Sequence, residues 1–137
     1  MTDCIFCNII AGEIPATKIY EDDDVLAFLD ITQTTPGHSL VVPKKHSRNL
    51  LAMNPNEAAS LFAKIPAIAN MIKDNLHASG MNILQNNEEE AGQTVFHTHV
   101  HLIPRYDQET DGLELAFTNN MDKYDLKELA SKITNED

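Results

Sequence analysis

Three histidines alternate with other residues in the stretch His97-Thr98-His99-Val100-His101. Successive side chains of a β-strand point to opposite faces, so a strand here would place the three imidazoles in one row, roughly 6–7 Å apart. A single histidine in an apolar segment is usually structural, but three of the chain's six in one row are hard to explain by packing. The row therefore predicts chemistry, either shared metal ligation or nucleophilic attack by a neutral imidazole.

The residues directly before this row favour phosphorus chemistry over a bare metal site. Ala91-Gly92-Gln93-Thr94 is a small, glycine-containing segment. Its backbone N–H groups, together with the Thr94 hydroxyl, could cradle a phosphate. An imidazole has a pKa near neutral pH and is a good nucleophile toward phosphorus. We therefore expect a phosphate site beside a nucleophilic histidine.

The only two cysteines, Cys4 and Cys7, form a second cluster of reactive groups. A three-residue separation closes too small a loop for a useful structural disulfide. A thioredoxin-like redox motif would follow a strand, and nothing of that kind precedes Cys4. Zinc ligation is therefore favoured, while buried free thiols and redox chemistry stay open as alternatives.

Short strands and few helices must position these groups. The 137 residues predict one domain, 1–137, without internal repeats or linkers. The pattern predicts a helical turn over Cys4–Gly12, a long helix over Pro55–Leu76 kinked at Pro66, and a weaker helix over Asp125–Ile133. Hydrophobic runs and alternation predict strands over Lys18–Glu21, Val25–Leu29, Ser39–Val42, Met81–Leu84 and Gln93–Ile103. This succession indicates an α+β fold with an antiparallel sheet.

The charge of the chain restricts its partners. The formal net charge is −11, and such a surface repels the backbone of DNA or RNA but still accepts a small nucleotide held by local groups. The sequence contains no run of about 18 apolar residues, so no membrane span is predicted. The first residues show no secretory signal. We therefore expect a cytoplasmic protein without polynucleotide or membrane partners.

The stretch from His97 to Ile103 resembles the His-x-His-x-His-x-x signature of the histidine triad (HIT) superfamily. The resemblance covers nearly the whole chain: Asp30, His38 and Pro43-Lys44-Lys45-His46 resemble an earlier block of that family, and Gly92-Gln93-Thr94-Val95 precedes the triad as it does there. It implies a single HIT domain over 1–137. The implied fold is an antiparallel sheet of about five strands with one long and one or two short helices, assembled as a homodimer.

The resemblance also implies a mechanism and a set of site residues. His99 would attack the α-phosphate of a purine nucleotide conjugate and form a nucleotidyl-histidine, with His101 and His38 beside it and no catalytic cofactor. Asp30 would bind the ribose, and Asn86, Gly92, Gln93 and Thr94 would lie at the phosphate. The base would lie between apolar walls formed by Phe6, Ile9, Ile14, Phe28 and Ile31. By likeness to bacterial members, a structural zinc would be held by Cys4, Cys7, His46 and His97.

Two branches of the superfamily and two other classes of function compete. Gly92-Gln93-Thr94 and Pro104-Arg105 resemble the dinucleoside polyphosphate hydrolases of the fragile histidine triad branch. The segment from Ile14 to His46 resembles the nucleotide-binding, phosphoramidate-cleaving branch. A nucleotide-binding sensor or interaction protein with little turnover would keep the same pocket. A zinc hydrolase would instead use all three triad histidines as metal ligands.

Overall fold

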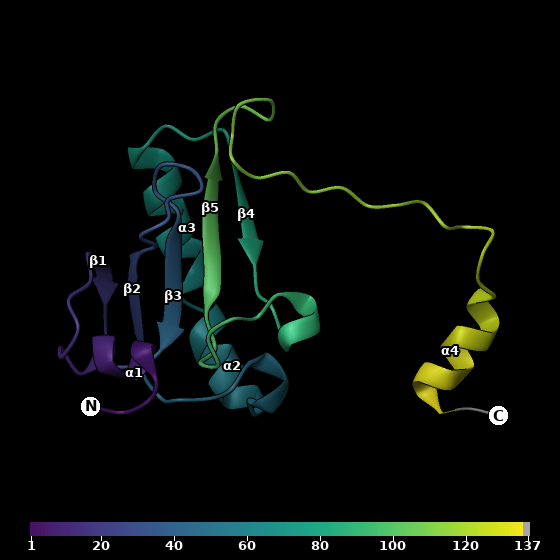
Figure 1. Cartoon of the computed structure of the whole chain (residues 1–137), viewed down its shortest axis with the longest axis horizontal. Helices are drawn as coiled ribbons and strands as arrows, with labels where there is room; N and C mark the ends of the chain where they lie inside the picture. The colour runs from purple at the N-terminus through teal and green to yellow at the C-terminus, as the bar shows by residue number, and fades with distance from the viewer. Residues whose placement is uncertain (136–137) are drawn as a thin grey trace.

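Five strands form one antiparallel sheet in the computed structural model, which describes residues 1–135 (Figure 1). They are β1 (Lys18–Glu21), β2 (Val25–Leu29), β3 (Ser39–Pro43), β4 (Gly80–Leu84) and β5 (Val100–Arg105), and they lie in the order β1-β2-β3-β5-β4. Every neighbouring pair is antiparallel. The predicted fold class is therefore confirmed.

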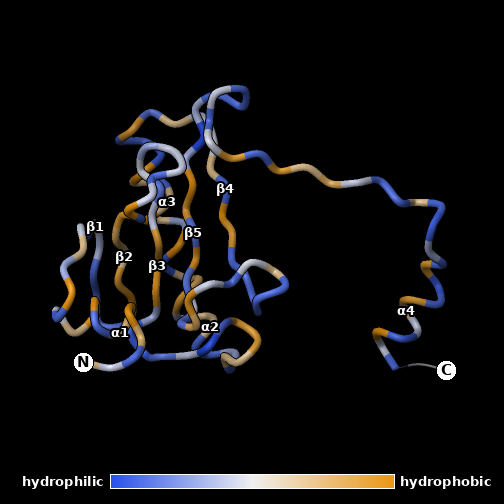
Figure 2. The backbone as a smooth tube through the Cα atoms, in the orientation of Figure 1, coloured by the Kyte–Doolittle hydropathy of each residue, from blue (hydrophilic) through white to orange (hydrophobic). Residues whose placement is uncertain are grey.

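The central strands are buried on both faces, which explains their continuous apolar sequences (Figure 2). One face packs against α2 (Pro55–Phe62) and α3 (Ile65–Asn75). The opposite face packs against α1 (Ile5–Ile10) through Leu26, Phe28, Leu40 and Val42. Since His101 pairs with Leu40 across β3 and β5, its side chain points to the α1 face. The candidate catalytic groups therefore gather on that face.

The predicted long helix is two helices, so the kink expected at Pro66 is a full break. α2 ends at Phe62 and α3 begins at Ile65. Proline has no N–H to donate, and its ring clashes with the carbonyl four residues earlier, so Pro66 is tolerated only in the first turn of a new helix. The other boundary signal is as predicted, because the Asn54 side chain accepts a hydrogen bond from the Glu57 N–H and caps α2.

The predicted strand over Gln93–Ile103 is wrong for its first seven residues, because β5 begins only at Val100. The backbone N–H of Thr98 donates to the Ser47 carbonyl instead of extending the ladder, and the two hydroxyls are 2.7 Å apart. The Pro43 carbonyl at the end of β3 accepts from the His97 side chain (2.8 Å). Hydrogen bonds to Ser47 and Pro43 thus replace strand pairing here, and His97 and His99 lie outside the strand that alternation predicts.

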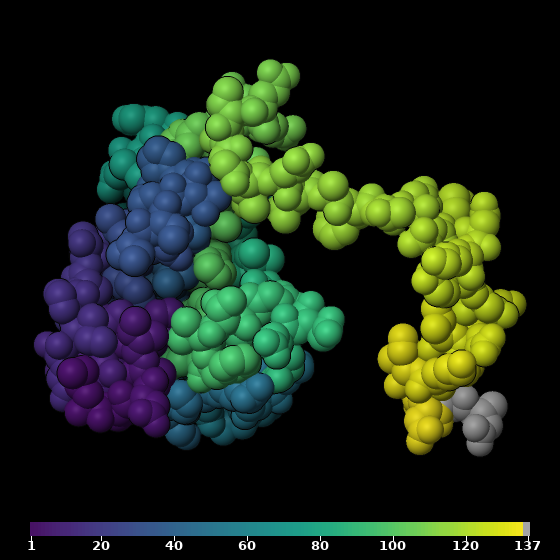
Figure 3. All heavy atoms as spheres, viewed as in Figure 1, coloured from purple at the N-terminus to yellow at the C-terminus, as the bar shows by residue number. Residues whose placement is uncertain are grey.

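The C-terminal segment forms an arm, residues 113–135, that stands apart from the body of the molecule (Figures 1 and 3). Arg105 anchors its start through Asp111 (3.0 Å), the Asn82 amide oxygen (2.6 Å) and the Leu113 carbonyl (2.9 Å). The arm carries α4 (Leu126–Thr134), close to the predicted Asp125–Ile133, with Asp125 as its cap. None of the helices within residues 1–135 is long and apolar enough to cross a membrane.

Candidate catalytic and metal sites

A backbone hydrogen bond selects the tautomer of His99. Its Nδ1 lies 2.7 Å from the His97 carbonyl oxygen, and since a carbonyl can only accept, Nδ1 carries the hydrogen. The neutral imidazole then keeps its lone pair on Nε2. The residue is 7% exposed, and the Phe6 ring stands edge-on to it with ring centroids 5.1 Å apart. The backbone therefore fixes both the tautomer and the orientation that a nucleophilic imidazole needs.

A second pair of imidazoles adjoins His99. The Thr34 N–H donates to His38 Nδ1 (3.3 Å), which leaves the hydrogen of a neutral His38 on Nε2. That Nε2 lies 2.9 Å from His101 Nδ1 and donates to it, so His101 carries its own hydrogen on Nε2. The rings of His99 and His101 have centroids 5.2 Å apart. The hydrogen bond from the Thr34 backbone thus sets the tautomer of His38, and His38 in turn sets the tautomer of His101.

Burial keeps this pair neutral. Burial, together with the charges that His99 and His38 would carry, lowers the pKa of His101 to about 4. Burial also lowers the pKa of His38, although the nearby Asp30 carboxylate opposes this effect. Both imidazoles are therefore uncharged at pH 7, and the hydrogen-bond assignment above applies at that pH.

Asp30 lies between the histidines and a cavity, with one carboxylate oxygen occupied and one open. Thr32 donates to Oδ1 through its N–H (2.8 Å) and its hydroxyl (2.6 Å). Oδ2 lies 3.7 Å from His38 Nε2. Burial acts to raise the pKa of Asp30, but the Thr32 hydrogen bonds outweigh it and the pKa is lowered. The second oxygen of an ionised carboxylate is therefore available to accept from a ligand hydroxyl.

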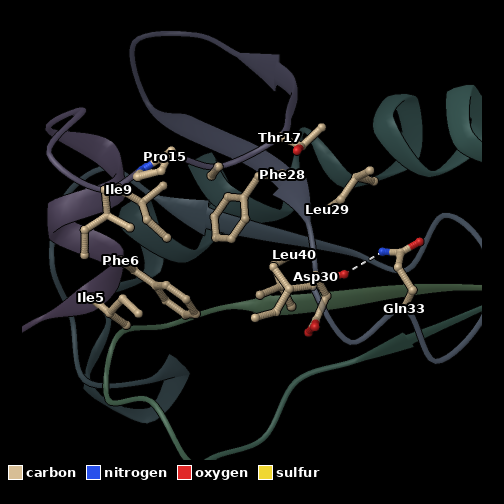
Figure 4. A pocket seen from close by; sticks show the side chains of 13 residues that line it. Ile5, Phe6, Ile9, Pro15, Thr17, Phe28, Leu29, Asp30, Gln33 and Leu40 are labelled. Carbon is tan, nitrogen blue, oxygen red and sulfur yellow. Dashed lines mark hydrogen bonds between the residues drawn. The ribbon is translucent and has the colours of Figure 1, made fainter.

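An apolar cavity of about 630 Å³ opens beside Asp30 (Figure 4). The Phe6 and Phe28 rings meet edge-on inside it, 5.7 Å apart. The five residues predicted as base walls all line it: Phe6, Ile9, Ile14, Phe28 and Ile31. An apolar cavity with one carboxylate at its edge suits a flat ring carrying a hydroxylated sugar. Because Phe6 contacts both this cavity and His99, the cavity and His99 are adjacent.

The predicted phosphate segment is a turn that follows β4 and includes a short 3₁₀ helix, η2 (Glu89–Ala91). Gly92 has φ +95°, and a Cβ there would lie 3.5 Å from the Asn86 amide nitrogen, so these two residues are neighbours. Thr94 is exposed. The Gln93 side chain is 2% exposed, and all its hydrogen-bonding groups have partners within the protein.

Cys4, Cys7, His46 and His97 converge, with potential ligand atoms all within 4.8 Å of one another. His97 Nδ1 lies 3.4 Å from Cys4 Sγ and 3.1 Å from His46 Nδ1, and Cys7 Sγ lies 3.4 Å from His46 Nδ1. Bond lengths to tetrahedral zinc imply ligand separations of about 3.3–3.8 Å, close to these values. The His97 Nε2–H donates to Pro43, which leaves Nδ1 free to bind metal. The donor set therefore fits zinc.

The triad histidines do not share one metal site. Within residues 1–135, His97 belongs to the cysteine cluster, His101 groups with Asp30 and His38, and no potential metal cluster contains His99. A zinc hydrolase that uses all three as ligands is therefore incompatible with the arrangement. His97 serves the cysteine cluster while His99 and His101 face the cavity side of the sheet.

Sequence reasoning missed a group of polar residues that fasten the loops of the site. Gln33 donates to the carbonyls of Asp30 (2.6 Å) and His38 (2.7 Å), and so joins two candidate site residues. Arg48, Asn49 and Glu88 form a second set, which joins the phosphate segment to residues 48 and 49. The contacts of Glu88 with Arg48 and Asn49 join residues 40 and 39 positions apart, so no local pattern identifies them.

Comparisons with known proteins agree with the family resemblance seen in the sequence. The HIT domain family model matches residues 11–108. A crystal structure of a HIT family member from Bacillus subtilis is 46% identical, with a TM-score of 0.92 over 98% of this chain and 96% of that chain. A histidine triad nucleotide-binding protein from Candida albicans is 34% identical, with a TM-score of 0.81 over 97% and 96%. Adenylylsulfatase HINT3 of Arabidopsis thaliana is 44% identical over 107 residues, which are 78% of this chain and 54% of that protein.

Proposed function

The chain belongs to the HIT domain family, and from this premise we propose that it hydrolyses or transfers the nucleotidyl group of purine nucleotide conjugates through a covalent nucleotidyl-histidine on His99. The observation that carries the proposal is the hydrogen bond from His99 Nδ1 to the His97 carbonyl, because it leaves the Nε2 lone pair available. The relatives named as a nucleotide-binding protein and an adenylylsulfatase support the same substrate class.

The proposed reaction has two steps. In the first, His99 Nε2 forms a bond to the α-phosphorus, and the bond from phosphorus to the leaving group breaks with its electron pair on that group, which takes a proton from solvent. In the second, water attacks the phosphorus, the P–N bond breaks, and its electrons return to Nε2. A nucleoside monophosphate is released and the water proton passes to solvent. Positioning and electrostatic stabilisation supply most of such catalysis.

The other residues hold the substrate in this proposal. The open oxygen of Asp30 accepts from the ribose hydroxyls, and the base packs against the apolar wall that includes Phe6 and Phe28. The His101 Nε2–H donates a hydrogen bond to a phosphoryl oxygen, since Nδ1 is already engaged by His38. Asn86, Gly92 and Thr94 surround the phosphate from the turn before the triad.

Zinc has a structural role in this proposal and takes no part in either step. Cys4, Cys7, His46 and His97 would bind it, and it would cross-link the N-terminal helix to the segment that carries His99. His97 then has two structural tasks, as a metal ligand and as the residue whose carbonyl orients His99. Loss of zinc would therefore loosen the nucleophile as well as the fold.

We also propose that the protein acts as a homodimer. Support comes from the arm, where Phe117, Leu126 and Ile133 are 97%, 75% and 83% exposed on the single chain. The amphipathic helix α4 buries none of its apolar residues on the single chain. Because most helices of this length depend on tertiary packing for stability, α4 needs a partner surface. A second copy of the chain would cover these residues.

Turnover with and without His99 tests the proposal. We expect wild type to release AMP from an adenosine phosphoramidate, and His99→Ala to lose this activity while still binding AMP. Adenylyl sulfate and diadenosine polyphosphates, assayed in parallel, identify the leaving group that the protein accepts. AMP binding without turnover by wild type on any of these substrates would instead support a nucleotide-binding sensor.

A further inference from the structure

We propose that Glu88 is a positioning residue that, held by Arg48 and Asn49, sets the backbone of the phosphate segment, residues 86–94. This inference rests on the proposed nucleotidyl transfer, because it assigns that segment to the substrate phosphate. The sequence alone presents Glu88 only as the first member of a glutamate run.

The backbone of Glu88 has an unusual conformation. Its φ is +73° and its ψ is 161°, a region that residues other than glycine rarely adopt because the Cβ is crowded. Such a conformation persists only where surrounding contacts impose it, and it is most common at functional sites. The position would suit glycine better, so the contacts of the glutamate side chain must account for the residue found there.

The Glu88 carboxylate makes three such contacts. Arg48 binds it in a bidentate manner, with Nε and Nη2 each 2.8 Å from a carboxylate oxygen, and the Asn49 amide donates to it at 2.6 Å. The Arg48 guanidinium also stacks on the Phe96 ring, 4.3 Å from its centroid. The hydrogen bond from Arg48, followed by that from Asn49, lowers the pKa of Glu88 to about 2. An isolated exposed ion pair contributes little, but this one is bidentate, stacked and joined to a buried amide.

The hydrogen bonds of Arg48 and Asn49 to the Glu88 carboxylate form a clamp, and Gln93 connects this clamp to the other end of the segment. Its Oε1 accepts from the Glu88 N–H (2.8 Å) and from the Asn49 amide (3.0 Å). Its Nε2 donates to the carbonyls of Arg48 (2.6 Å) and Val95 (3.0 Å). Both ends of the turn are therefore fastened to residues 48 and 49, and the Gln93 amide has no group left for a ligand. The Gln93 side chain therefore holds the backbone of the segment in place and does not contact the phosphate.

The clamped segment bridges two parts of the site. It begins two residues after Leu84, the last residue of β4, which pairs with His101. It is followed by Val95, which packs against the apolar cluster that contains Phe6 and Phe28. A shift of the turn would therefore move Asn86 and Gly92 relative to both the histidines and the cavity. A misplacement of about 1 Å can cost roughly a hundredfold in rate.

The test compares Glu88→Ala, which removes the clamp and keeps the strain, with Glu88→Gly, which removes both. Glu90→Ala is the matched control, because Glu90 is an exposed member of the same glutamate run. Three quantities are measured: kcat/KM on an adenosine phosphoramidate, the affinities for AMP and for adenosine, and the thermal midpoint. We expect both Glu88 variants to lose about 10–100-fold in kcat/KM and about tenfold in AMP affinity, with adenosine affinity unchanged.

Stability separates positioning from a merely structural role. Glu88→Gly should have a higher thermal midpoint than Glu88→Ala, because glycine relieves the strain, yet it should be equally impaired in binding AMP. Recovery of AMP affinity in Glu88→Gly, or wild-type AMP affinity in Glu88→Ala, would overturn the proposal. These binding results need no turnover. Wild type that binds AMP without turning over any substrate would refute the proposed reaction alone, and the AMP affinities would still decide the role of Glu88.

Discussion

The hydrogen-bonded pair of buried His38 and half-buried His101 should make the stability of the protein depend on pH in a specific range. An imidazole has a pKa of about 6.5 in an unfolded chain, whereas burial holds the pKa of His101 at about 4 in the fold. Between these values the unfolded chain binds more protons than the folded protein. The contribution of His101 to the free energy of unfolding is therefore complete above pH 6.5 and declines as the pH falls toward 4.

The size of the effect follows from the two pKa values. One pKa unit corresponds to about 1.4 kcal/mol, so the interval from 6.5 to about 4 corresponds to roughly 3 kcal/mol. The pKa of His38 is also lowered by burial and changes stability in the same direction. Replacing His101 with glutamine removes one titrating group and keeps an acceptor for the His38 Nε2–H.

Urea unfolding of wild type and His101→Gln at pH 7, 6, 5 and 4 measures this difference. Each protein is loaded with zinc, so proton competition at the metal ligands affects both proteins alike. We expect wild type to lose roughly 3 kcal/mol more than the variant between pH 7 and pH 4. Parallel curves for the two proteins would refute the argument that His101 is held neutral by burial.

Three further predictions concern the turn before His38, the metal cluster and the arm. Gly37→Ala should lower the free energy of unfolding by at least about 1–2 kcal/mol in urea, because φ is +94° and a Cβ would collide with Leu76; an unchanged midpoint would show that the turn adjusts freely. Cys4→Ser should weaken zinc binding at least about tenfold in a chelator titration and lower the thermal midpoint, and full metal content at wild-type stability would contradict the cluster. Removal of residues 113–137 should convert a dimer into a monomer in sedimentation equilibrium, and equal subunit numbers in the two forms would show that the arm does not join copies.

Local sequence signals predict the parts of the fold that local interactions stabilise. The hairpin of β1 and β2 has its predicted bounds, and Asp22 shows why, since its carboxylate accepts from the N–H groups of Asp24 and Val25 at the turn. The same holds for the cap at Asn54. The five apolar wall residues also line one cavity, as the resemblance implies.

Local patterns fail where distant residues decide the conformation. The alternation of His97, His99 and His101 predicts a strand, but Ser47 pairs with Thr98 and Pro43 pairs with His97, and both partners lie about fifty residues away. The alternation instead places His97 and His101 in two different side-chain clusters. An amphipathic pattern likewise predicts α4 but gives no information on what covers its apolar side.

The polar network that holds the phosphate segment shows the same limit. Gln93 stands where the resemblance implies a phosphate contact, yet its side chain reaches Arg48, which lies 45 residues earlier in the chain. The sequence places the glutamine in the segment before the triad but cannot show toward which side its side chain turns. That direction depends on packing between two loops.

Intact-protein mass spectrometry tests the central claim most directly. Wild type and His99→Ala are each mixed briefly with an adenosine phosphoramidate and quenched in acid. We predict that wild type gains the mass of one AMP and that His99→Ala gains none, since His99 Nε2 is the nitrogen left free for attack. An equal adduct on both proteins, or product release by wild type without an adduct at any mixing time, would contradict covalent transfer through His99.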